Sequence, residues 1–76
     1  MTGDELADIR RSLKLSIVRF GRALGHSGDD KNISRTMRRY ESNEKEIPPW
    51  IARLALMFER YGVPEGFFED DDHQPK

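Results

Sequence analysis

The chain has 76 residues, of which 36% are apolar and 36% are charged. A chain of this length builds one small hydrophobic core and leaves too little material for a deep catalytic cleft. It contains no cysteine, which excludes disulfide frameworks and thiolate metal sites, and no apolar stretch approaches the roughly 18 residues that cross a bilayer. With an acidic start that is unlike a signal peptide, this composition predicts a cytoplasmic protein.

The net charge of −1 conceals an uneven distribution of charge. Residues 10–39 carry nine basic side chains against two acidic ones, so that this segment has a charge of +7. Residues 1–9 carry −3 and residues 64–76 carry −4. A strongly basic middle between two acidic ends is compatible with a polyanionic partner.

Two short helices are predicted before residue 25. The capping-box spacing of Thr2 and Glu5, followed by apolar residues at helical intervals, predicts a first helix from about Gly3 to Lys14. A second helix is expected over Ser16–Leu24, with the serine as N-cap. Gly21 lies inside this helix, where glycine costs about 1 kcal/mol relative to alanine. Either another helix approaches closely there, or the helix is locally weak.

Two more helices follow a polar segment, rich in turn formers, that predicts a loop. The third helix should run from about Asn32 to Ser42, capped by Asn32 or Asp30, with Asn43 in the left-handed conformation after it. The fourth should begin at Pro48-Pro49 and carry an apolar stripe as far as Tyr61.

The end of the chain is expected to contain a short extra turn over residues 63–68 and a disordered acidic tail over residues 69–76. Trp50 is expected to cover the edge of the core, although it could stack on a base or a partner. Phe67-Phe68 could extend the core or seal a homodimer. No alternation typical of strands occurs, so the predicted fold is all-α, with one domain over residues 1–68.

The sequence offers little for catalysis. There is no glycine-rich phosphate loop, and the two histidines, His26 and His73, lack companion ligands or a nucleophile at useful spacing. The acidic tail could attract a cation weakly, but a solvated tail is favoured. We expect no enzyme activity, no metal, no cofactor and no small-molecule substrate.

The third helix carries a basic surface that points to a different function. Arg38 and Arg39 follow Arg35 by three and four positions, so both project beside it, and Ser34 is next to it in the chain. A helix fits the DNA major groove, where an arginine can bind guanine in a bidentate manner. The alternative is a solvated face on which these arginines pair with Glu41, Glu44 and Glu46, for example Arg38 with Glu41.

Four segments of the chain carry a family resemblance: Leu13-Lys14-Leu15-Ser16, Phe20-Gly21-Arg22-Ala23-Leu24-Gly25, Thr36-Met37-Arg38-Arg39-Tyr40-Glu41 and Ile47-Pro48. In combination they resemble the Cro/CI-type (XRE-type) helix-turn-helix of bacterial and phage repressors, over residues 2 to about 60. The resemblance implies a lambda-repressor-like bundle of four to five helices, in which the second helix braces the third in the major groove. Such proteins typically bind inverted repeats as homodimers and repress transcription, frequently of their own operon.

Position by position, the resemblance implies two groups of DNA contacts. The base contacts are Ser34, Arg35, Arg38 and Arg39. Thr36 and Asn43 match positions that usually touch phosphate or support the turn after the helix. Beyond the resemblance, Arg19, Lys31 and Asn32 are also expected to contact phosphate. The resemblance also implies that Met37 and Tyr40 are buried, that Glu41 is a structural acid, and that Gly21 lies where the second and third helices cross.

Two features depart from the family pattern. The stretch from Gly25 to Thr36 is about six residues longer than usual, which makes His26–Lys31 an insertion in the turn. The insertion could contact the DNA backbone through Lys31 or move the start of the helix. Ile17 stands where the family commonly has a phosphate-binding glutamine.

The sequence therefore predicts a DNA-binding transcriptional regulator, a homodimeric repressor that binds an inverted-repeat operator and is associated with the nucleoid in the cytoplasm. The alternative is a protein-interaction module, antiactivator or antitoxin-like, whose working surface is the acidic tail with Phe67-Phe68. An activator or excision factor that uses the same DNA-binding surface would have the same sequence features.

Overall fold

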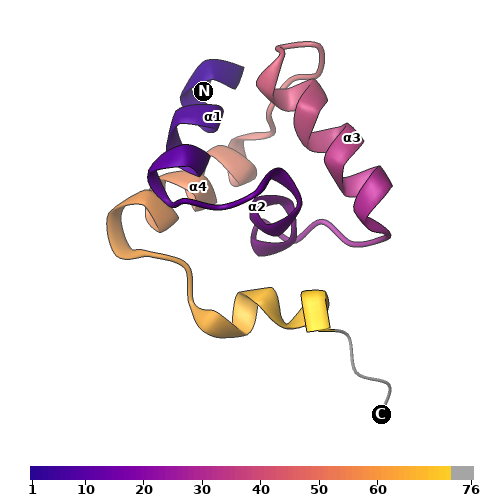
Figure 1. Ribbon diagram of the computed structural model, residues 1–76. Coiled ribbons are helices and arrows are strands. Elements are labelled where there is room, and N and C mark those ends of the chain that lie inside the picture. Colours follow the sequence, from indigo (N-terminus) through magenta and orange to yellow (C-terminus); the bar gives the residue numbers. More distant parts are fainter. Residues whose placement is uncertain (73–76) are drawn as a thin grey trace.

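The computed structural model describes residues 1–72, with side chains for residues 1–68, and contains four α-helices followed by a 3-10 helix (Figure 1). The elements are α1 (Gly3–Ser12), α2 (Ile17–Ala23), α3 (Asp30–Glu41), α4 (Pro49–Tyr61) and η1 (Glu65–Asp72). No strand occurs within residues 1–72, so the predicted all-α class is confirmed. None of the helices in this part of the chain has the length and apolarity to cross a membrane.

The helices begin at residues whose side chains satisfy free backbone amides. The Thr2 hydroxyl accepts from the Glu5 amide at 3.1 Å, and the Glu5 carboxylate accepts from the Thr2 amide at 2.7 Å, so the predicted capping box is present. Ser16 caps α2 as predicted, by accepting from the Arg19 amide. Proline occupies the first turn of α4, where the amide that it lacks would have no partner.

The start of α3 differs from the prediction. Neither Asn32 nor Asp30 is the N-cap; the carboxylate of Asp29 accepts from the Asn32 amide at 2.9 Å, and the helix begins at Asp30. Several residues in this segment have side chains that can cap a helix, and Gly28, with φ of 113°, turns the chain so that Asp29 is the one in position. As a result α3 begins two residues earlier than predicted.

The ends of α1 and α3 are set by residues in the left-handed conformation. Lys14 has φ of 60°, which stops α1 at Ser12, two residues before the predicted end. Asn43 has φ of 65° directly after the cap of α3, as predicted. The 3-10 helix runs to Asp72, beyond the predicted turn over residues 63–68. Residues 73–76 of the predicted disordered tail lie outside the described residues.

The core takes side chains from all four α-helices. Its fully buried large side chains are Leu6, Phe20, Leu24, Ile33, Met37 and Ile51. Phe68 is half-buried against this core, and Phe67 meets Phe58 edge to face with ring centroids 5.6 Å apart. Thus Phe68 extends the core, one of the two roles expected for the aromatic pair, whereas Phe67 remains 44% exposed.

The expectation that Trp50 covers the edge of the core is wrong, and the apolar stripe of α4 does not reach Tyr61. Trp50 is 56% exposed and Tyr61 is 76% exposed. The buried side of α4 is defined by Ile51, Ala55 and Phe58. At 100° per residue, both aromatic residues project about 60° to 100° away from that side.

Gly21 explains how α2 and α3 approach each other. A Cβ atom at this position would lie 2.5 Å from Cγ2 of Ile33 and 3.0 Å from Cγ of Met37. Both distances are shorter than ordinary van der Waals contact. Close approach of another helix, the first of the two readings of this glycine, is therefore confirmed.

Candidate nucleic-acid interface

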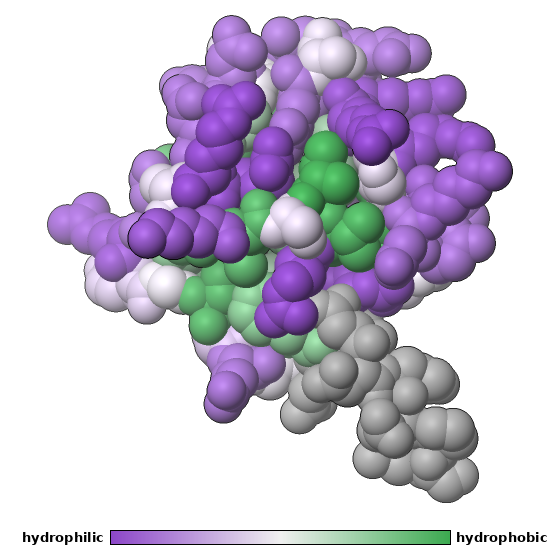
Figure 2. Space-filling view, viewed as in Figure 1, coloured by the Kyte–Doolittle hydropathy of each residue, from purple (hydrophilic) through white to green (hydrophobic). Residues whose placement is uncertain are grey.

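One face of α3 is buried and the opposite face is basic. Ile33, Met37 and Tyr40 pack into the core at intervals of three and four residues. The exposed positions on the other side are Lys31, Asn32, Arg35, Arg38 and Arg39. Figure 2 shows hydrophilic side chains gathered over α3, beside a band of apolar residues over α2. The core thus determines which side chains of α3 face outward.

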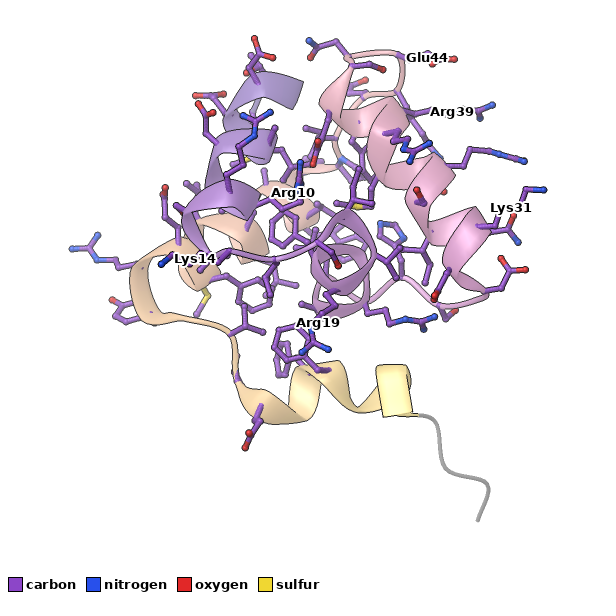
Figure 3. All side chains as sticks on the ribbon, in the orientation of Figure 1. Arg10, Lys14, Arg19, Lys31, Arg39 and Glu44 are labelled. Atoms are coloured by element: carbon purple, nitrogen blue, oxygen red, sulfur yellow. The ribbon has the colours of Figure 1, made fainter. Side chains whose placement is uncertain are left out.

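An open groove follows this basic face. Its lining residues are Lys31, Ser34, Arg35, Arg38, Arg39, Ser42 and Glu44. All four side chains predicted to contact bases, together with one predicted phosphate contact, are therefore brought together on one surface. Lys31 and Arg39 point outward from α3 near its two ends in Figure 3.

The cations of this groove are largely unneutralised. Among the side chains that the structure describes, no carboxylate forms an ion pair with Lys31, Arg35 or Arg38. Arg39 and Glu44 lie 3.9 Å apart, and both are more than half exposed. Such a pair is worth less than about 1 kcal/mol in water, so Arg39 can exchange it for another anion.

The alternative in which Glu41 neutralises Arg38 is wrong. Glu41 instead pairs with Arg10 of α1, with Nε to Oε2 at 2.8 Å and Nη2 to Oε1 at 3.3 Å. The Arg10 guanidinium also donates to the Leu15 carbonyl at 3.2 Å. Only 18% and 13% of the two side chains are exposed, so this bidentate pair is shielded from water. Glu41 therefore acts as a structural acid, the role that the resemblance implies, and its partner lies on another helix.

A second contact holds the C-terminal end of α3 against α1. The Asn43 side-chain oxygen accepts from the Gly3 amide at 2.8 Å. Gly3 itself is buried, and a Cβ atom there would collide with the backbone carbonyls of Tyr40 and Glu41. The basic helix is thus fixed at this end by backbone packing and by hydrogen bonds that span 31 and 40 residues of sequence.

The turn between α2 and α3 is short and is held by Arg22. Its guanidinium donates to the Gly28 carbonyl at 3.2 Å and to the Asp30 carboxylate at 2.7 Å, and only 11% of the side chain is exposed. Since the C-cap of α2 is Leu24 and the N-cap of α3 is Asp29, four residues separate the two caps. Part of the predicted His26–Lys31 insertion therefore lengthens α3 rather than the turn.

His26 lies in this turn against the inner side of α3. Its ring is 5.7 Å from that of Tyr40, and its Nε2 atom is buried without a hydrogen-bond partner in the described structure. Burial lowers the pKa of His26, and the nearby Lys45 lowers it further. The neutral imidazole is therefore the form that fits this position.

The other predicted phosphate contacts lie outside the groove lining. Arg19 is on α2, with its guanidinium carbon 4.2 Å from the ring centroid of Phe68, and in Figure 3 it points toward η1. Asn32 is exposed in the first turn of α3, Thr36 is half-buried, and Asn43 holds the Gly3 amide. Ile17 is partly buried and packs against the core.

We compared the chain with known proteins. No protein-family model, curated protein or solved structure matches it.

Two residues of this surface were missed at the level of sequence. The sequence assigned no partner to Arg10 or to Arg22. Their partners lie 31 and 8 positions away, and neither spacing belongs to a local helical pattern. The sequence contains a weak indication of the Arg22 pair, since Arg22 precedes a glycine-rich turn and Asp30 follows it.

Proposed function

We propose that this protein is a sequence-specific regulator of transcription that binds double-stranded DNA, with α2 and α3 as its helix-turn-helix and α3 in the major groove. The observation that carries the proposal is the groove along α3. It gathers five predicted contact residues, and three of its cations have no carboxylate partner among the side chains of residues 1–68. Unpaired cations on a rigid helix retain their full attraction for phosphate and base edges.

Different residues of α3 contact the bases and the phosphates. Arg35 lies near the centre of the exposed face, so it is our choice for bidentate binding to guanine O6 and N7. Ser34, Arg38 and Arg39 read neighbouring base edges, while Lys31 at the start of the helix reaches a phosphate.

Phosphate contacts from other positions would orient the protein on the duplex. Arg19 supplies one from α2, Asn32 and Thr36 supply two from α3, and Asn43 supplies one after it. The Asn43 oxygen is engaged by the Gly3 amide, which leaves the side-chain NH2 group as the donor to a phosphate.

The proposal includes a homodimer that represses transcription. One α3 face spans only a few base pairs, whereas two copies on an inverted repeat double the number of contacts. Occupancy of an operator that overlaps a promoter would then block RNA polymerase, in the cytoplasm at the nucleoid and without a cofactor or small-molecule ligand. This part of the proposal rests on the resemblance to Cro/CI-type regulators.

The test begins with selection of a duplex from a random DNA library, followed by fluorescence-anisotropy titration of the selected and a scrambled duplex. We expect the selected duplex to bind at least about a thousandfold more tightly. Its affinity should fall steeply with salt because bound counterions are released.

Two arginine variants make the test specific to α3. We expect Arg35→Ala to lose about 1–3 kcal/mol of binding free energy and to relax preference at one base pair. Arg53→Ala, which removes an exposed arginine from α4, is the matched control and should bind as the wild type does. Weak binding to both duplexes, or an unchanged Arg35→Ala, would reject the proposal and favour a protein-interaction module.

A further inference from the structure

The outer face of α4 is an apolar surface that the rest of the described chain does not cover. Trp50 is 56% exposed, Leu56 52%, Met57 57% and Tyr61 76%. Trp50, Met57 and Tyr61 are seven and four residues apart, so they project from one side of the helix. A hollow over the last turn is lined by Leu56, Met57, Glu59, Arg60 and Tyr61.

The size of this surface limits what can cover it. The exposed area of Trp50, Met57 and Tyr61 is on the order of 400 Å², which is within the range for the largest patch of a typical monomer. A stable dimer buries about 800 Å² on each partner, which is more than this face offers. The area suits a single docked helix.

The charges on this face identify the chemistry of the partner. Arg53 and Arg60 are exposed, lie seven residues apart and border the apolar side chains. Glu59 lies on the far side of the hollow, about 180° around the helix from Trp50. If two copies paired through antiparallel α4 helices, the Arg53 end of one would meet the Arg60 end of the other, and like charges would repel.

We propose that the outer face of α4 binds an amphipathic helix of another protein. The apolar stripe of that helix would cover Trp50, Met57 and Tyr61, and its acidic residues would pair with Arg53 and Arg60. Helices commonly dock in this way, with apolar anchors at intervals of three, four and seven residues.

This surface is separate from the basic face of α3. In Figure 1, α3 forms the right side of the molecule, whereas α4 runs behind α1 toward the left. The proposal therefore does not depend on DNA binding, and both surfaces can be occupied together.

Two synthetic peptides of 18 residues test the proposal. They share leucines at helical intervals and differ only at their charged positions, which are glutamate in one peptide and lysine in the other. Both carry fluorescein and lack tryptophan, so anisotropy reports binding while the emission of Trp50, the one tryptophan of the chain, reports its location. We expect the acidic peptide to bind at least tenfold more tightly and to shift the Trp50 emission to shorter wavelength.

Charge-reversal variants distinguish the two basic surfaces. The double variant Arg53→Glu/Arg60→Glu should reverse the preference to the basic peptide, with an unchanged circular dichroism spectrum. The matched control, Arg35→Glu/Arg38→Glu, should leave the acidic peptide bound and the Trp50 shift intact. Equal affinity for both peptides, absence of binding, or loss of binding in the α3 control would overturn the proposal. A dimer detected by sedimentation would also overturn it, if the Trp50 emission of the dimer lies at shorter wavelength without any peptide.

Discussion

The Arg10–Glu41 pair should stabilise the fold because it joins α1 to α3 beneath the candidate DNA-binding helix. We predict the outcome of a double-mutant cycle with Arg10→Ala, Glu41→Ala and both together. At 2.8 Å and an effective dielectric constant of about 20, the gross attraction is about 6 kcal/mol. Desolvation and the ordering of two long side chains oppose most of it.

We therefore expect a coupling free energy of about 1.5–2.5 kcal/mol between the two side chains. Glu41→Ala alone should lower the free energy of unfolding by about 2–3 kcal/mol. Arg10→Ala should cost about 1 kcal/mol more, because it also removes the hydrogen bond to the Leu15 carbonyl. A domain of this size has a total stability of about 4–11 kcal/mol, so a wild type above about 5 kcal/mol leaves both single variants folded and the cycle measurable.

Urea unfolding followed by circular dichroism at 222 nm measures these free energies, in 0.15 M and 1 M NaCl. The matched control is the Asp8–Arg11 pair, whose side chains are 76% and 66% exposed. Its coupling should be about 0.5 kcal/mol or less and should vanish in 1 M salt, whereas most of the Arg10–Glu41 coupling should remain. A coupling below about 0.5 kcal/mol for Arg10–Glu41, or its complete loss in salt, would refute the reasoning.

Two further predictions concern the packing around α3. Gly21→Ala should lower the free energy of unfolding by about 1–2 kcal/mol, since overpacking against Ile33 costs more than the roughly 1 kcal/mol gained in helix propensity; thermal unfolding that shows a more stable variant would contradict this. Because the folded-state pKa of His26 lies below its ordinary value of 6.5, the unfolded chain binds the proton more readily, and stability should fall as the pH drops from about 6.5 through the folded-state pKa. Urea titrations between pH 7.5 and pH 5, roughly the window in which histidine titrates, measure this loss of unfolding free energy. His26→Phe should lose less of it than the wild type, and equal losses would contradict the lowered pKa of His26.

The local features of this chain were predictable because their causes lie within a few residues. The capping box at Thr2–Glu5, the serine cap of α2 and the left-handed Asn43 each depend on side chains next to the backbone that they stabilise. The basic face of α3 was also predictable, since helical periodicity alone separates its arginines from Ile33, Met37 and Tyr40.

The start of α3 and the partner of Glu41 required the tertiary structure. Asp29 is the cap because the turn, held by Arg22, brings its carboxylate to the Asn32 amide, whereas the sequence offers other residues of similar capping strength. Glu41 lies at helical spacing from Arg38 but pairs with Arg10, because packing α1 against α3 brings that guanidinium to 2.8 Å and shields it from water.

The helices, their order and the basic residues of α3 follow from capping and periodicity along the sequence. The exposure of Trp50 and Tyr61, and the lack of an ion pair at Arg35 and Arg38 among the described side chains, depend on tertiary packing. The physical reason is that burial and ion pairing depend on which helix faces meet. That choice is made by contacts such as Gly3–Asn43, which join residues 40 positions apart.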